Sequence, residues 1–170
     1  MRVFTVLFLF FLHFNFWAAQ HGAVATVDPI ATDAAIAAMK QGGRKQVGSG
    51  YYIHVSPQQV YLAGGIWHPD MDTLASIRDF IVAWPNKFEK VVLDKSFLKT
   101  FDGLGGDQLK TAPRGFPKDH PQIQWLRHKD HIVSHQVEPK EILSEKFIKK
   151  AGKIYEKMLP LNQFIKEAIS

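Results

Sequence analysis

The stretch GSGYYIHVSPQQVYLAGGIWHPD, residues 48–70, decides the fold. Apolar side chains occupy every second position of its first run: Tyr51, Ile53 and Val55. This alternation is typical of a strand with one buried face. A turn at Pro57-Gln58 leads into a second apolar run, residues 60–67, which Gly64-Gly65 interrupts. The sequence therefore predicts a β-hairpin near residues 51–67, with a bulge or close backbone approach at the two glycines.

Helix signals follow the hairpin directly. Asp70 or Asp72 can cap a helix that runs to about Ala83, because an aspartate side chain can accept hydrogen bonds from the first free N–H groups of a helix. Pro85 suits the first turn of a second, shorter helix that extends through Val92. Two consecutive helices are therefore expected after the hairpin.

The second half of the chain repeats both kinds of signal. Asp119 is predicted to cap a helix that continues to about His128, and residues 131–137 alternate like a third strand. A helical C-terminus begins at Pro139, and Pro160 is expected to break it. The fold class predicted is α+β: a small antiparallel sheet, made of the hairpin near 51–67 and the strand near 131–137, packed with several helices.

Composition limits the possible functions. The chain has 170 residues, of which 46% are hydrophobic and 22% charged, and this balance is typical of one globular domain. The absence of cysteine excludes disulfides, thiolate catalysis and cysteine-ligated zinc. A net charge of +5 favours anionic partners. The basic residues are spread along the chain, which argues against nucleic-acid binding without excluding it.

The first residues differ from the rest. Residues 1–25 resemble a secretory signal peptide: Arg2 precedes an apolar run, and Ala23-Val24-Ala25 matches a cleavage pattern, with a weaker one at Trp17-Ala18-Ala19. A wrong start site and a native core segment are the alternatives. Residues 26–39 are predicted to be a weakly structured lead-in, and residues 40–170 a single domain without a stable membrane span. Export is expected if the signal is genuine, and a cytoplasmic location otherwise.

The loop LKTAPRGFPKDH, residues 109–120, is the main candidate for a binding site. Lys110, Arg114 and Lys118 lie on a path shaped by glycine and proline, and we expect them to bind a small phosphate- or carboxylate-bearing ligand. Three further residues could join them: Arg44, His68 and Arg127. The alternative is a set of solvated charges on a loop of fixed shape. An interaction with an acidic protein or with RNA also remains open.

Asp119-His120 could act as an acid–base pair, because a carboxylate commonly orients an imidazole. Adjacent side chains rarely point at each other, so a helix cap and a local hydrogen bond are the simpler interpretation. Among the other histidines, His131 and His135 would be about 13 Å apart on one strand and could not bind one ion, whereas His128 and His131 straddle a helix end and could. The histidines do not show the dense spacing of a metal site. No metal and no cofactor are predicted.

Several motifs together indicate a family. GSGYYIHV, GGIWHPD, GDQLKTAPRGFPKDHP, LRHKD and LPLNQF occur in the order and spacing of the domain of unknown function 2461 family, which the chain resembles over about residues 40–170. The resemblance implies no activity. Members usually carry an earlier Arg-x-x-Arg-Asp-x-Arg-Phe pattern, which residues 1–39 lack. If that pattern forms half of a family site, this chain carries only the other half.

Overall fold

The computed structural model describes residues 23–25, 48–55, 59–144 and 146–170. The predicted signal segment up to residue 22, the lead-in from residue 26 and Arg44 lie outside the described residues. The elements follow in this order: β1 (Ala23–Ala25), β2 (Gly50–Val55), β3 (Val60–Ile66), α3 (Met71–Ala83), α4 (Pro85–Val92), α5 (Lys95–Phe101), α6 (Ile123–Leu126), β4 (His131–Val137), the 3-10 helix η1 (Pro139–Leu143) and α7 (Phe147–Ala168).

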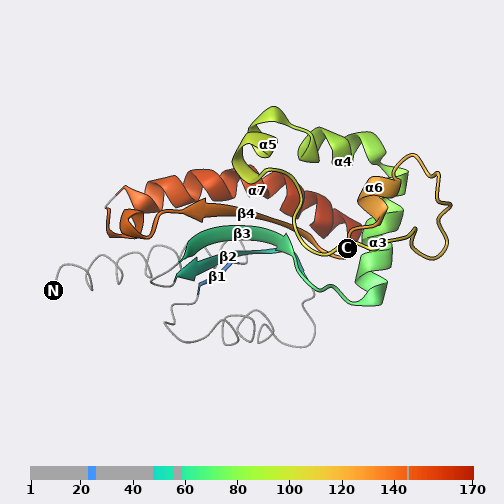
Figure 1. Ribbon diagram of the computed structural model, residues 1–170, viewed down its shortest axis with the longest axis horizontal. Coiled ribbons are helices and arrows are strands. Elements are labelled where there is room, and N and C mark those ends of the chain that lie inside the picture. Colours follow the sequence, from blue (N-terminus) through green and yellow to red (C-terminus); the bar gives the residue numbers. More distant parts are fainter. Residues whose placement is uncertain (1–22, 26–47, 56–58, 145) are drawn as a thin grey trace. The chain divides into compact units, whose positions relative to one another are not determined.

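The strands form one sheet in the order β1-β2-β3-β4. Strands β2, β3 and β4 are antiparallel, as Figure 1 shows, so the α+β class and the hairpin are confirmed. The short strand β1 pairs in parallel with β2, and Ala23 lies opposite Tyr51. Ala23–Ala25 had been predicted to be a cleavage pattern. Cleavage after Ala25 would remove this strand, whereas cleavage after Ala19 would retain it.

The described residues belong to two compact units. The first contains β1, residues 50–64 and residues 134–157. Its core lies where the sheet meets the first half of α7: the rings of Tyr51 and Tyr155 pack edge to face at 5.4 Å, and the buried Tyr155 hydroxyl donates to the Tyr52 carbonyl at 3.0 Å. This bond satisfies a buried hydroxyl, and burial raises the pKa of Tyr155 well above its usual value.

The second unit contains residues 65–133 and 158–170, and its core is aromatic. Phe164 of α7 packs against Phe80 of α3 and Phe88 of α4, with ring centroids 4.9 Å apart in both pairs. Phe88 also meets the buried His131 of β4 edge to face at 6.3 Å. Four elements, α3, α4, β4 and α7, are thereby held around one cluster of rings.

Capping and periodicity explain the helices of the second unit. The Asp70 side chain accepts a hydrogen bond from the Thr73 N–H at 2.7 Å at the start of α3, as predicted, and the same bond lowers the pKa of Asp70. Pro85 is the first residue of α4, also as predicted. The sequence did not predict α5, which Asp94 caps in the same way through the Phe97 N–H at 2.9 Å.

Two helix predictions need correction. The helix expected from Asp119 to His128 is a single turn, α6, because turns occupy residues 118–119 and 121–122, and Asp119 caps nothing. The expected break at Pro160 does not occur, and α7 continues through it. Met158, Leu161 and Ile165 are buried on both sides of the proline, so packing compensates for the lost hydrogen bond. Among the described helices, none has the length and apolar character needed to span a membrane.

Candidate functional site

The basic loop is anchored by a short antiparallel pairing of two segments. Gly105 pairs with Ile132, and Gln108 pairs with His128. The Lys129 N–H donates to the Asp107 carbonyl at 2.8 Å, which continues the pairing between these bridges. Residues 105–109 therefore run beside residues 127–132, although about twenty residues separate them in the sequence. This pairing decides which side chains of the loop meet.

Lys110 follows directly from this pairing and lies next to Arg127. The Leu109 N–H donates to the Arg127 carbonyl at 2.7 Å, and Arg127 Nε donates to the Leu109 carbonyl at the same distance. Arg127 is half-buried, and this reciprocal pair of bonds fixes the base of its guanidinium. The bond uses Nε only, so the Nη edge of the guanidinium retains its donors.

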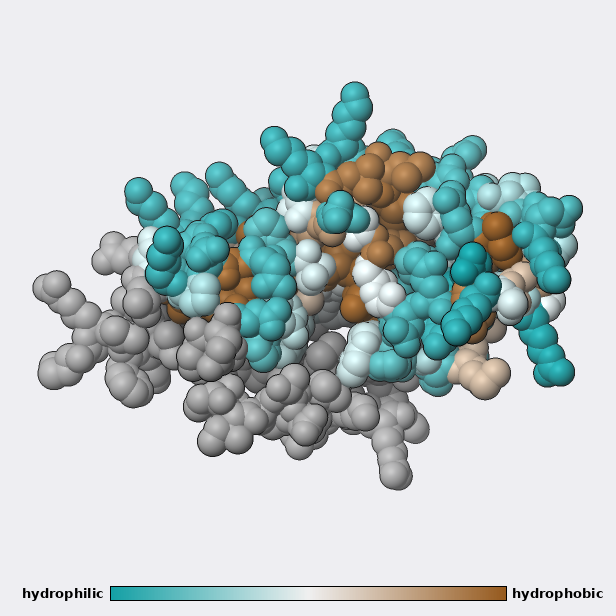
Figure 2. All heavy atoms as spheres, in the orientation of Figure 1, coloured by the Kyte–Doolittle hydropathy of each residue, from teal (hydrophilic) through white to brown (hydrophobic). Residues whose placement is uncertain are grey.

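A hollow of about 250 Å³ lies at this point of the loop. Its lining contains three cationic side chains, one hydroxyl-bearing residue and two apolar residues: Lys110, Lys118, Arg127, Thr111, Ala112 and Ile123. No carboxylate is among these lining residues. Hydrophilic side chains predominate at the right-hand end of the molecule in Figure 2, where Figure 1 shows the loop that joins α5 to α6. The site is therefore an open, positively charged concavity.

A buried carboxylate holds the segment from which the basic loop begins. Asp130 is 1% exposed, and its two oxygens accept hydrogen bonds from backbone N–H groups: Oδ1 from His68 at 2.7 Å and Oδ2 from Asp107 at 2.9 Å. The carboxylate thereby joins the segment before α3 to the segment that carries the basic loop. Buried acidic groups are tolerated when both oxygens are satisfied in this way.

Arg78 of α3 provides a second support. Its Nε donates to the Leu126 carbonyl at 2.8 Å, and its Nη2 donates to the His128 carbonyl at 3.3 Å. These carbonyls lie at the end of the single turn α6, where backbone oxygens lack partners within the helix. Arg78 therefore holds the turn on both sides of Arg127, one of the residues that line the hollow.

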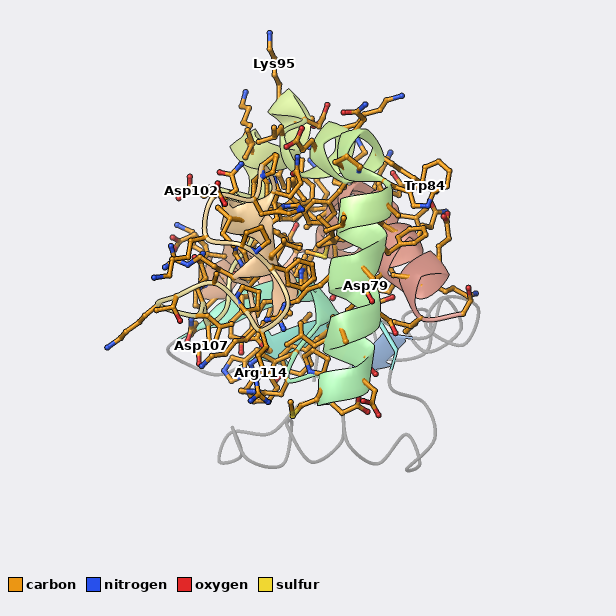
Figure 3. The ribbon with its side chains drawn as sticks, turned by 90° about the vertical axis from the view of Figure 1, so that its right-hand side faces the viewer. Asp79, Trp84, Lys95, Asp102, Asp107 and Arg114 are labelled. Carbon is orange, nitrogen blue, oxygen red and sulfur yellow. The ribbon has the colours of Figure 1, made fainter. Side chains whose placement is uncertain are left out.

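The predicted ligand-binding residues separate into two groups. Lys110, Lys118 and Arg127 line the hollow together. Arg114 is exposed and is not among the lining residues. In Figure 3 its label lies near that of Asp107 and far from that of Lys95. His68 contributes its backbone N–H to Asp130, and Arg44 lies outside the described residues. The structure thus brings three of the six predicted residues together.

The predicted acid–base pair has a different local geometry. His120 Nδ1 accepts a hydrogen bond from the Gln122 N–H at 3.0 Å, which requires that nitrogen to be unprotonated and leaves Nε2 as its N–H. Asp119 is exposed in the preceding turn. Among the hydrogen bonds of the described residues, none joins these two side chains, so His120 is oriented by backbone and not by the carboxylate.

His128 and His131, which the sequence offered only as a pair that could bind a metal ion, are both buried, and this burial was not predicted. The rings of His128 and His131 lie 6.1 Å apart, and Gln108 Nε2 lies 3.1 Å from His128 Nε2. Burial lowers the pKa of His128, and burial together with the neighbouring His128 and Arg78 lowers that of His131 to about 3. Both rings are therefore neutral near pH 7. No group of three His, Cys, Asp or Glu side chains in the described part of the chain could hold a metal ion.

Sequence reasoning found the three cationic residues of the lining but missed its uncharged residues and the supports of the hollow. Thr111, Ala112 and Ile123 carry no charge signal, and Asp130 looks like any acidic residue of a polar stretch. The alternation of residues 131–137 is the one sequence signal that could have suggested that His131, the residue after Asp130, is buried. The missing information is the pairing of two distant segments, which local patterns do not encode.

Comparison with known proteins gives one match. The sequence model of a family described as "Conserved hypothetical protein (DUF2461)" matches residues 28–164, which confirms the resemblance found from the motifs. The match contains every described residue that lines the hollow. Neither the curated proteins nor the solved structures gave a match.

Proposed function

The chain belongs to the family of conserved hypothetical proteins DUF2461, and from this premise we propose that its basic hollow binds a small anion that carries a phosphate or carboxylate group. The family description supplies no activity, so the proposal rests on the site itself. One observation carries it: three cationic side chains from two segments of the chain line the same hollow, and no lining residue is acidic.

Grouping cations in this way is electrostatically unfavourable without an anion. Like charges on neighbouring side chains repel each other, and beside the protein wall of a hollow solvent screens the repulsion less than it does in bulk water. Arg127 is held in place by Leu109, so this charge cannot move away at low cost. An anion in the hollow would relieve the repulsion and accept charge-assisted hydrogen bonds from lysine and arginine.

Two other functions were considered from the sequence. Acid–base catalysis would need Asp119 to orient His120, and the Gln122 N–H occupies His120 Nδ1 instead. A protein or RNA partner would be favoured by a broad basic face, whereas two cations of the loop, Lys110 and Lys118, line one hollow together with Arg127. Binding of a small anion is therefore the function that these contacts favour.

The test is titration of the full chain with inorganic phosphate and with acetate at low ionic strength, followed by calorimetry. Lys118→Gln should weaken the binding of at least one of these anions about fivefold, because one direct charge interaction is lost. Lys110→Gln should behave in the same way. Both lysines are exposed and form no ion pair among the described residues, so neither change should affect folding.

Two matched controls separate the hollow from general surface charge. Lys95→Gln removes the same charge from the start of α5, and Arg114→Gln removes a charge from the same loop outside the hollow. Both variants should bind like the wild type. If all four variants bind equally well, or if neither anion binds, the proposed function is wrong.

A further inference from the structure

We propose that the hollow is selective for the dianionic phosphate of a phosphate monoester, with the esterified group placed against Ile123 and Ala112. The inference rests on the proposed function and deepens it, since it names the class of ligand. It depends on three features: the number of positive charges around the hollow, the hydrogen-bond donors that the cationic side chains offer, and the presence of apolar residues in the lining.

The charges favour a dianion over a monoanion. Lys110, Lys118 and Arg127 contribute three positive charges, and the lining contains no carboxylate to offset any of them. The acidic Asp107 nearby pairs with Lys129 at 3.7 Å, outside the lining. A monoanion would leave most of the repulsion in place, whereas a phosphate monoester carries between about 1.5 and 2 negative charges at pH 7.

The distribution of donors favours a tetrahedral group over a planar one. Arg127 uses Nε for the Leu109 carbonyl, and its Nη edge can bind two oxygens in parallel. That edge engages both oxygens of a carboxylate, so the two lysines would have to share the same two oxygens with the arginine. A group with three terminal oxygens offers the lysine ammonium groups an oxygen that the arginine does not use, so all three cations can bind without crowding.

The apolar lining and the size of the hollow describe the rest of the ligand. Ile123 and Ala112 offer no hydrogen bonds, so contact with a hydrocarbon part of the ligand is favourable there. The volume of about 250 Å³ is below the roughly 300–1,000 Å³ of pockets that enclose a drug-sized molecule. The hollow can therefore hold the phosphate and the first atoms of the group attached to it, while a larger remainder stays outside.

The experiment measures the affinity of the full chain for four probes under identical conditions at pH 7.5: phenyl phosphate, phenyl sulfate, benzoate and inorganic phosphate. Phenyl sulfate keeps the tetrahedral group and the ring but has one charge, and benzoate has one charge on a planar group. Phenyl phosphate should bind about tenfold more tightly than either, because it adds charge-assisted bonds to the lysines. It should also bind several-fold more tightly than inorganic phosphate because of the apolar contact.

Variants link the selectivity to the site. Lys118→Gln should reduce the preference for phenyl phosphate over phenyl sulfate, while Lys95→Gln should leave it unchanged. Ile123→Ser should remove the advantage of phenyl phosphate over inorganic phosphate. If Ile123→Ser does not fold, the wild type still tests the apolar contact. Equal affinity of the wild type for inorganic phosphate and phenyl phosphate would show that this contact contributes nothing.

The outcomes separate the two proposals. Equal affinity for phenyl phosphate and benzoate, with binding lost in Lys118→Gln, would overturn the selectivity and leave anion binding intact. Equal affinity for the phosphate and the sulfate would overturn the argument from charge. No binding of any probe would overturn both proposals. Tighter binding of a single-stranded oligonucleotide, with a steep dependence on salt, would replace the monoester by a nucleic-acid backbone.

Discussion

Asp130 combines two roles within one side chain. It places a charge in the interior, and it connects the N–H groups of two segments that have no regular structure of their own. The hollow depends on this connection, because Lys110 follows the segment that Asp130 holds at Asp107. A structural carboxylate thus supports the hollow without being one of its lining residues.

Replacing Asp130 by alanine should destabilise the protein by about 2–4 kcal/mol. The change leaves two N–H groups near a buried position without their acceptors and opens a small cavity. Chemical denaturation of the variant measures the effect. Asp119→Ala is the control, because that carboxylate is exposed and should change the free energy of unfolding by less than about 0.5 kcal/mol. Equal stability of the two variants would mean that the Asp130 hydrogen bonds contribute little.

His131 makes stability depend on pH. The side chain is 0% exposed, and neither ring nitrogen has a hydrogen-bond partner among the described residues. Its pKa is lowered from 6.5 to about 3 in the folded protein, so the unfolded chain binds the proton more readily. The folded state is therefore destabilised as pH falls from 6.5 toward 3, and this contribution is absent above about pH 7.

The prediction is a loss of about 2 kcal/mol between pH 7 and pH 5 from His131 alone, at 1.36 kcal/mol for each pH unit below 6.5. Urea denaturation of His131→Phe should show a correspondingly smaller loss over the same interval. Phenylalanine fits the contact with Phe88, and removing two unpaired ring nitrogens should not reduce stability at pH 7. An unchanged pH dependence in this variant would show that folding does not lower the pKa of His131.

At the scale of elements, the approach of β3 to β4 depends on Gly65. A Cβ atom at this position would lie 2.0 Å from the His131 carbonyl oxygen and 2.8 Å from Ile132 Cα, both of which belong to the backbone. The residue also has a φ of +118°, which side chains disfavour. The expected bulge or close approach at the glycines is thus confirmed as a close approach at Gly65.

Gly65→Ala should destabilise the protein by about 3 kcal/mol or more, because the strand backbones must move apart to accommodate a methyl group. Gly103→Ala is a matched control: its φ is +99°, but no atom lies within 4 Å of the added Cβ. It should therefore report the conformational cost alone, about 1–2 kcal/mol. Thermal denaturation of the two variants compares them, and similar melting temperatures would refute the steric argument.

The helices show how far local signals extend. The cap at Asp70 and the start of α4 at Pro85 were predicted because such a residue and the helix that it begins are neighbours in sequence. The region from Asp119 to His128 has comparable signals, but turns occupy residues 118–119 and 121–122, and from Arg127 onward the backbone pairs with residues 105–109. Only one turn of helix forms between them. At Pro160 the local rule failed in the opposite direction, since buried side chains on both sides keep α7 continuous.

At the scale of the whole molecule, the sequence by itself determined the α+β class, the hairpin, the third strand, the cap of α3, the start of α4 at Pro85, and family membership. Each follows from alternation, capping or motif spacing, which act between residues a few positions apart. Only the tertiary structure decided that Lys110, Lys118 and Arg127 share a hollow while Arg114 does not, and that Asp130 and His131 are buried. The physical reason is that these arrangements depend on the pairing of segments about twenty residues apart and on packing between helices, which no local pattern specifies.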